Sequence, residues 1–284
     1  MSKFTNKVDF TLLVTVKNAN PNGDPLNGNR PRENYDGFGE ISDVCIKRKV
    51  RNRLQDFEKG SIFVQSDERC DDGYKSLSDR AKGYEPLQKA LKDKDKDAYA
   101  KAACEKWIDV RSFGQVFAFK DDSVSVGVRG PVSIHSAVSL SPVDIYSMQI
   151  TKSVNSETKD KKSSDTMGMK HRIDFGMYLI KGSINQQLAE KTGFSNEDAE
   201  LIKKALSTLF VNDTSSARPD GSMEVRKLYW WKHNNQTGQY SSAQVHRSLK
   251  IDLKDGIDNP KKFEDYDINL ESLSGLEVEI NDGL

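Results

Sequence analysis

The sequence is poor in the residues that build disulfide frameworks and metal centres. Its 284 residues include only three cysteines and four histidines. The cysteines at positions 45, 70 and 104 form no CxxC pair, and the histidines form no HxxxH or HExxH motif. A disulfide scaffold and a zinc site are therefore not expected, although this argument leaves carboxylate-bound Mg²⁺ open. We predict no cofactor and no dedicated metal site.

Long apolar runs are also missing. No run reaches the length that crosses a membrane, and the first one, Phe10 to Val16, contains two threonines and follows Asp9. Such a segment does not resemble a signal peptide or an anchor. The composition, with 36% hydrophobic and 30% charged residues, is typical of a polar globular protein. We expect a cytoplasmic protein without a membrane partner.

Net charge is absent as well, because 43 basic residues balance 43 acidic ones, yet the charges are unevenly spread. Residues 44–53 contain five cations and no acid, whereas residues 251–284 contain ten acids and three cations. A concentrated basic cluster indicates an anionic partner, most often a phosphate backbone. The alternative is a solvated helix face. The acidic segment suits either contact with a basic surface or simple solubility.

Local patterns predict the first strand and helix. Residues 8–17 alternate between apolar and polar side chains, which predicts a strand. The turn formers Asn20-Pro21-Asn22-Gly23-Asp24-Pro25 follow and open a long loop to about residue 40. Ser42 can cap a helix whose apolar stripe includes Val44, Val50 and Leu54 and which ends near Gly60.

The middle of the chain mixes helix and strand signals. Residues 66–84 read as loop, 85–107 as one charged helix, and 115–119 as a strand. Between 123 and 141, apolar residues fall at even positions and small polar ones at odd positions, with Arg129, Ser133 and His135 among the latter. A small polar strand face allows close approach of RNA, whereas the alternative is an ordinary solvated face.

The last part continues the alternation of strands and helices. Residues 152–169 contain a polar run that cannot bury a core, and we expect a mobile excursion there. Strands are predicted at 173–180 and 225–231, on either side of a helix that begins at the capping box Ser195–Asp198. This order predicts an α+β fold of ferredoxin-like, RRM-like topology with insertions. The RNP1 pattern of ordinary RRM domains is absent.

Candidate catalytic residues have structural alternatives. Asp24, Asp43 and Asp109 could act on RNA with a metal ion or as bases, but each also suits a turn, a first helical turn or an ion pair with arginine. His135 and His171 lack a suitably spaced nucleophile or second histidine. By contrast, Lys170-His171-Arg172 stands where the polar excursion ends and suits a segment that folds over bound RNA; the alternative is three exposed residues at the start of a strand. We predict a binding protein and no enzyme.

Five short motifs occur in family order: Asn20–Pro25, Asp43–Arg51, Asp109–Gly114, Gly130–Ile134 and Met167–His171. Together they resemble the backbone, crRNA-binding subunit of CRISPR type I Cascade in the RAMP superfamily, most closely its type I-C version. One departure is Phe175, where relatives are expected to carry tyrosine.

The resemblance implies an RRM-like palm over residues 1–250 with a helical insertion at about 60–107 and a thumb at about 145–175. The acidic segment 251–284 would pack on the palm or on a neighbouring subunit. Many copies would polymerise along one guide crRNA, beside other Cascade subunits, and present it for pairing with a target DNA strand, while a recruited helicase-nuclease cuts. The alternatives are a metal-assisted ribonuclease like type III backbone subunits and a stand-alone RRM-like RNA binder.

The cations of the second motif would contact guide phosphates, chiefly Lys47 and Arg51. The complete set of predicted RNA-binding residues is Asn20, Asn22, Arg30, Lys47, Lys49, Arg51, Arg53, Arg111, Arg129, Ser133, His135, Lys170, His171 and Arg172.

Overall fold

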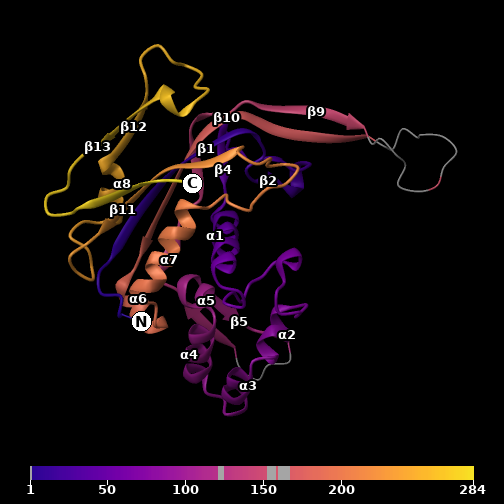
Figure 1. The fold of residues 1–284 in the computed structure, drawn as a ribbon, viewed down its shortest axis with the longest axis vertical. Helices are drawn as coiled ribbons and strands as arrows, with labels where there is room; N and C mark the ends of the chain where they lie inside the picture. Colours follow the sequence, from indigo (N-terminus) through magenta and orange to yellow (C-terminus); the bar gives the residue numbers. More distant parts are fainter. Residues whose placement is uncertain (1, 121–124, 152–157, 159–166) are drawn as a thin grey trace.

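The computed structural model describes residues 2–120, 125–151, 158 and 167–284. Its centre is an antiparallel sheet in which neighbouring strands follow the order β14-β11-β1-β10-β8-β4 (Figure 1). These strands are β14 (Val278–Asp282), β11 (Met223–Lys232), β1 (Val8–Ala19), β10 (Met167–Ile184), β8 (Ala137–Pro142) and β4 (Phe38–Ile41).

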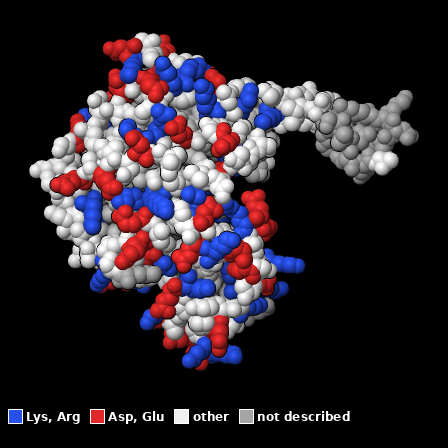
Figure 2. Space-filling model, viewed as in Figure 1, with Lys and Arg blue, Asp and Glu red and all other residues white. Residues whose placement is uncertain are grey.

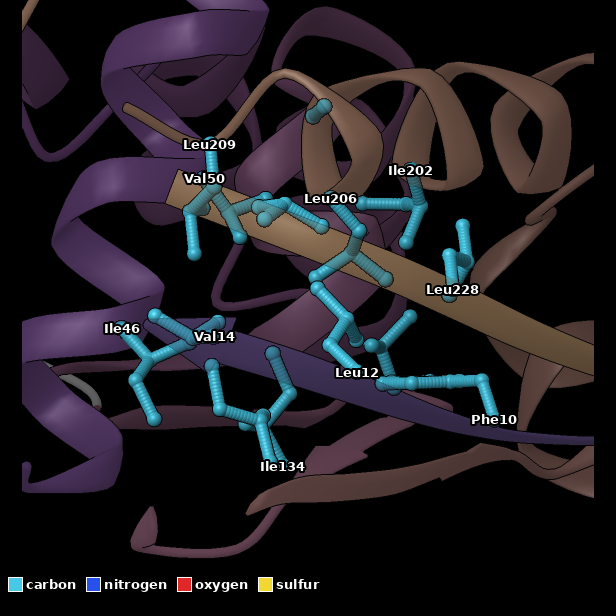
Figure 3. Packing of buried hydrophobic residues seen from close by; sticks show 14 of the residues in the cluster. Phe10, Leu12, Val14, Ile46, Val50, Ile134, Ile202, Leu206, Leu209 and Leu228 are labelled. Carbon is cyan, nitrogen blue, oxygen red and sulfur yellow. The ribbon is translucent and has the colours of Figure 1, made fainter. Parts of the chain in front are cut away.

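The predicted α+β, ferredoxin-like topology is confirmed. Helix α1 (Asp43–Phe57) follows β1 and precedes β8 in the chain, and α7 (Asn196–Ser207) connects β10 to β11. The strands β1, β8, β10 and β11 are thus the first to fourth strands of the unit. The four inner strands therefore follow the order fourth, first, third, second of a βαββαβ unit. Both helices lie on one face, where Ile46 and Val50 of α1 and Leu206 of α7 pack against Leu12 and Val14 of β1 (Figure 3).

Caps and apolar periodicity explain these two helices. The Ser42 hydroxyl accepts a hydrogen bond from the Cys45 amide, and Ser195 and Asp198 form the expected capping box. Val44 was predicted in the apolar stripe of α1, but its side chain is 67% exposed. That prediction is wrong because Val44 lies in the first turn, on the side of α1 that faces away from the sheet.

The opposite face of the sheet is covered by the C-terminal part of the chain. Helix α8 (Ser242–Ser248) and the hairpin β12 (Leu249–Leu253) and β13 (Tyr266–Leu270) pack there, with Val245 and Tyr266 against Met177 and Trp231. The sheet is therefore buried on both sides. The face that carries RNA in ordinary RRM domains is occupied here by protein.

Residues between α1 and the second half of the sheet form an insertion with its own hydrophobic core. It comprises α2 (Leu77–Lys82), α3 (Glu85–Lys92), α4 (Lys96–Lys106), α5 (Ile108–Phe113), β5 (Gly114–Phe117) and β6 (Val126–Arg129). Its core runs from Phe63 to Val126 and extends past the predicted end at residue 107. In Figure 1 it lies below α1.

Three local predictions in this insertion need correction. Residues 66–84 were predicted as loop but contain α2, which Ser76 caps. The single helix expected over 85–107 is two helices, because the chain turns at Lys94 with a φ of 55°. The strand expected to reach residue 119 ends at Phe117, where its pairing with β6 stops.

Strand β9 (Ile145–Thr151) pairs with the first part of β10 and forms a hairpin that projects from the sheet (Figure 1). We call residues 145–151 and 167–173 the hairpin. The polar excursion predicted at 152–169 lies mostly outside the described residues, at 152–157 and 159–166. Its last part is wrong, because Met167 and Met169 pair with Thr151 and Gln149 in the ladder.

The alternation predicted over 123–141 holds only in part. Positions 123 and 124 lie outside the described residues, and Val132 and Ile134 of β7 (Val132–Ile134) point inward. After His135 the pattern inverts, so that Ser139 is 3% exposed and Val138 is 39% exposed. The reason is that β7 and β8 are separate strands, and a shift of one residue between them exchanges the two faces.

The remaining elements of the described residues are short: β2 (Gly23–Asp24), β3 (Arg30–Pro31), α6 (Gln186–Thr192) and single turns of 3₁₀ helix at Pro25–Asn27, Asp67–Arg69 and Phe263–Asp265. Among the described residues, no helix is both long and apolar enough to cross a membrane.

Candidate nucleic-acid interface at the base of the hairpin

A hollow of about 250 Å³ opens where the hairpin leaves the sheet. Three segments that are distant in sequence line it: the loop after β1, the hairpin, and the loop before β11. Its lining residues are Asn20, Gly28, Asn29, Ile150, Met169, Lys170, His171, Ser216 and Ala217. The structure thus brings the predicted residues Asn20, Lys170 and His171 together.

The hairpin strands beside this hollow carry only positive charge. The described strands of the hairpin contain Lys170, His171 and Arg172 and no acid. In Figure 2, blue side chains lie between the body of the protein and the grey tip. The first acid below them on β10 is Asp174, and its carboxylate is paired with the Lys261 ammonium at 2.9 Å. A basic, half-enclosed surface of this kind attracts phosphate.

A chain of hydrogen bonds joins the long loop to the hairpin. The Arg30 guanidinium donates to the Ser147 hydroxyl at 2.8 Å, and that hydroxyl lies 2.7 Å from Nδ1 of His171. Arg30 and His171 were predicted as RNA-binding residues, and the structure places them on one hydroxyl group. The arrangement leaves Nε2 of His171 on the side away from Ser147.

Arg172 lies on the other face of the hairpin, where its guanidinium stacks over the ring of Tyr146 at 4.8 Å. The Tyr146 hydroxyl donates to Asn18 at 2.8 Å. Asn18 has a φ of 53°, a left-handed conformation that asparagine tolerates better than most residues. Through Asn18, the stacked pair connects the hairpin to the end of β1.

The motif Asn20–Pro25 has a clear structural basis. Asn20 is 3% exposed, and its side-chain amide nitrogen donates to the backbone carbonyl of Asn29 at 2.7 Å. Asn22 accepts from both the amide and the hydroxyl of Ser42, at 2.9 and 2.8 Å, and so fastens the loop to the N-terminus of α1. A Cβ at Gly23 would lie 1.9 Å from the Asn29 side chain. Asn22 therefore acts within the protein, whereas Asn20 both closes the loop and lines the hollow.

The basic cluster of α1, whose cations were predicted to contact RNA, is partly buried. Lys49 and Arg53 are only 4% and 9% exposed. Lys49 forms an ion pair with Asp213, and Arg53 contacts Asp56 at 2.5 Å and Thr208 at 3.1 Å. Burial lowers the pKa of Lys49, and Asp213 opposes that shift. The two side chains are part of the fold, and their position leaves little surface for a ligand.

Lys47 and Arg51 are more accessible but also paired. Lys47 contacts Asp43 at 2.9 Å, one turn earlier on α1. Arg51 donates to Asp109 at 3.0 Å and lies over the ring of Phe113. Exposed side-chain fractions are 24% for Lys47 and 13% for Arg51, so Lys47 is the better candidate for an external phosphate.

Arg111 is occupied within the protein. Its guanidinium makes two hydrogen bonds to Asp198 at 2.8 and 3.0 Å and one to the Cys104 carbonyl at 3.2 Å. Asp198 belongs to the capping box of α7, so this ion pair fastens the helical insertion to the palm.

Arg129, Ser133 and His135 lie far from the hollow. All three are exposed, but Ser133 pairs with Ser183 near the end of β10, while His171 stands near its start. Twelve residues of strand separate these positions, a distance of about 40 Å. The ring of His135 instead lies 6.1 Å from that of His246. These three predicted residues therefore form a region separate from the hollow.

The candidate catalytic acids all have internal partners. Asp24 caps the turn at Leu26, Asp43 pairs with Lys47, and Asp109 accepts from two backbone amides as well as Arg51. Within residues 2–120, 125–151, 158 and 167–284, no group of three or more His, Cys, Asp or Glu side chains is arranged to hold a metal ion.

The sequence analysis missed several residues of this region, among them Tyr146, Ser147, Ser216 and Ala217. The strand character of residues 145–151 was a usable signal for the first two, because a strand there must pair with the one that carries Lys170. Ser216 and Ala217 gave no signal, since they stand in an irregular loop.

Comparison with known proteins gives a consistent family. Residues 6–271 match the family model of CRISPR-associated protein Cas7. A protein of that name from Haloferax volcanii is 27% identical over an alignment of 229 residues, which covers 74% of this chain and 66% of that protein. The matched region is thus slightly under two thirds of the length of that relative.

Two solved structures are similar at low identity. A chain of a "CRISPR RNA-guided surveillance complex, pre-nicking" has a TM-score of 0.48 and 17% identity, and covers 83% of both chains. A chain of a "CRISPR RNA-guided surveillance complex" has a TM-score of 0.42 and 18% identity, covering 79% of this chain and 68% of the other. Because the family match spans residues 6–271, the chain belongs to the Cas7 family of CRISPR-associated proteins.

Proposed function

We propose that this protein is a crRNA-binding backbone subunit of a type I-C-like Cascade complex. Several copies would line one guide RNA and present it for pairing with a target DNA strand. Its other partners would be the remaining Cascade subunits and a recruited helicase-nuclease. In such an assembly the protein contributes shape and charge, while base pairing selects the target sequence.

The observation that supports this function most strongly is the hollow at the base of the hairpin. Lys170 and His171 border it without a neighbouring acid on the hairpin strands, and Asn20 and Ser216 add polar groups. Cations and small polar groups hold phosphate and sugar without reading a base, which suits a subunit that must accept any guide. We propose Asn20, Arg30, Lys47, Lys170, His171 and Arg172 as the residues of this interface.

The exposed residues Arg129, Ser133 and His135 would form a second contact along the same RNA or with a neighbouring subunit. Their distance from the hollow means that one nucleotide cannot bridge both regions. A filament in which RNA runs along the protein could use both.

The salt dependence of RNA affinity tests this proposal. We expect Lys170→Ala to weaken binding of single-stranded RNA equally for different sequences and to reduce the slope of log K against log salt concentration by about 0.7, the loss of one phosphate contact. Lys101→Ala is the matched control, because that lysine is 77% exposed on the helical insertion. Equal slopes for wild type and Lys170→Ala would contradict the proposed interface.

We further propose that the protein does not cleave RNA. The assembled complex, incubated with complementary RNA and Mg²⁺, should leave that RNA intact. Cleavage that Asp24→Asn or Asp43→Asn abolishes would instead identify a metal-assisted ribonuclease.

A further inference from the structure

Lys49 is a lysine of the basic helix that points into the protein. Its side chain is 4% exposed, its ammonium contacts the carboxylate of Asp213, and it lies 5.6 Å from the centre of the Phe210 ring. Burial of an ammonium group is unfavourable unless a counter-ion and good geometry compensate for it. The contact with Asp213 supplies that counter-ion.

Asp213 has a second partner, Arg218, whose Nε lies 3.3 Å away. Between these two residues the chain forms a tight turn, in which the backbone amides and carbonyls of Ser215 and Arg218 bond to each other at 2.9 and 3.1 Å. One carboxylate therefore joins α1 to both ends of a short turn, residues 213–218.

This turn is one wall of the hollow. Ser216 and Ala217 line it, and the Ala217 carbonyl accepts a hydrogen bond from the backbone amide of Asn20 at 2.9 Å. Asn20 lies on the same wall. The position of Asp213 therefore determines where Ser216, Ala217 and the backbone of Asn20 stand relative to Lys170.

We infer that Lys49, Asp213 and Arg218 are positioning residues for nucleic-acid binding, which hold the 213–218 turn as a wall of the hollow and do not themselves contact phosphate. The inference rests on the proposed function, since it concerns the same hollow. It assigns Lys49 a role different from that of Lys47 on the same helix, although both belong to one basic cluster in the sequence.

Asp213→Asn is the most discriminating variant because two explanations predict opposite signs. Removal of an acid near a polyanion site should strengthen RNA binding if charge alone matters. If the carboxylate holds the wall, the same change should weaken binding, because Lys49 loses its counter-ion and Arg218 loses its anchor. We expect a loss of roughly tenfold in affinity, the size of a typical coupling between contacting residues.

The experiment measures binding of a labelled single-stranded RNA to the full chain over a range of salt concentrations. We expect Asp213→Asn and Lys49→Met to weaken binding with the salt slope unchanged, since no phosphate contact is lost. Lys101→Met, the exposed control, should behave as wild type. The double variant Lys49→Met/Asp213→Leu should recover part of the loss, because apolar replacement of both partners leaves no unpaired buried charge.

Hydrogen exchange of residues 213–218 supplies a second readout. Their amides should exchange faster in Asp213→Asn, while those of β1 remain protected. Because this measurement uses Asp213→Asn, it tests whether the carboxylate holds the 213–218 turn even if Lys49→Met fails to fold.

The outcomes separate this inference from the proposed function. If wild type and Lys101→Met do not bind RNA, the proposed function fails. If they bind RNA and Asp213→Asn binds equally or more tightly, only the positioning role is refuted. A reduction of the slope by about 0.7 in Lys49→Met would also refute it, because that result indicates a direct phosphate contact.

Discussion

Replacement of Asp109 by alanine should be among the most damaging single changes in this protein. Asp109 is 1% exposed and links three segments. Its carboxylate accepts from the amides of Phe63 and Val64 at 2.8 and 3.0 Å, and from the Arg51 guanidinium at 3.0 Å. The side chain therefore fastens the start of the helical insertion to α1.

The expected cost follows from the groups that the variant leaves behind. Asp109→Ala leaves two amides without their acceptor and an Arg51 side chain, 13% exposed, without its counter-ion. Removal of one partner from a buried ion pair costs about 3–5 kcal/mol. A typical domain is stable by about 5–15 kcal/mol, so the variant should lose a large share of its stability.

Urea denaturation measures this loss as a lower midpoint at unchanged slope. Glu105→Ala is the control, because the Glu105 side chain on α4 is 64% exposed and its distance to Lys101 is 4.0 Å; it should change stability by less than about 0.5 kcal/mol. A loss below about 1 kcal/mol in Asp109→Ala would refute the structural role. Asp109 would then again be a candidate for a catalytic role.

Three further predictions concern other parts of the molecule. Gly130→Ala should destabilise the fold by about 3 kcal/mol or more, because its Cβ would lie 2.3 Å from the Ser112 carbonyl, whereas Gly127→Ala, with nothing within 4 Å, should change little in thermal unfolding. Burial lowers the pKa of His246 below its ordinary 6.5, with Asp9 opposing and Lys181 and His135 reinforcing the shift. As the pH drops, the unfolded chain therefore takes up the proton at this histidine before the folded chain does. The free energy of unfolding should fall as pH drops below 6.5, and it should fall less steeply in His246→Gln than in wild type. Asp267→Lys, on the exposed side of the β12–β13 hairpin, should weaken self-assembly on long RNA in sedimentation while short-RNA binding by one subunit is retained; normal assembly would rule out this contact.

Much of the palm could be predicted from the sequence because its signals are local. The alternation of residues 8–17 specified β1, and Ser42 and Ser195 marked the first residues of two helices before any tertiary contact was known. The order of these elements was sufficient for the α+β topology. Lys170 and His171, which line the hollow, were predicted as candidates because they stand at the end of a polar run.

The burial of charged residues could not be predicted, because their partners are distant in sequence. Lys49 and Asp213 are 164 positions apart, and Arg53 and Thr208 are 155 apart. A cation that pairs inside the fold and one that faces solvent look the same in the sequence. The inversion at Ser139 has a similar origin, since its hydroxyl accepts from the Gly39 amide of the neighbouring strand β4.

The nucleic acid that co-purifies with the protein, expressed together with its CRISPR array, tests the central claim most directly. Extraction and sequencing should give one population of RNA of uniform length that carries the array's guide sequences, and Lys170→Ala/Arg172→Ala should retain much less of it. Recovery of no RNA, of DNA, or of cellular RNA of mixed length and sequence would contradict a role as a crRNA-binding backbone subunit.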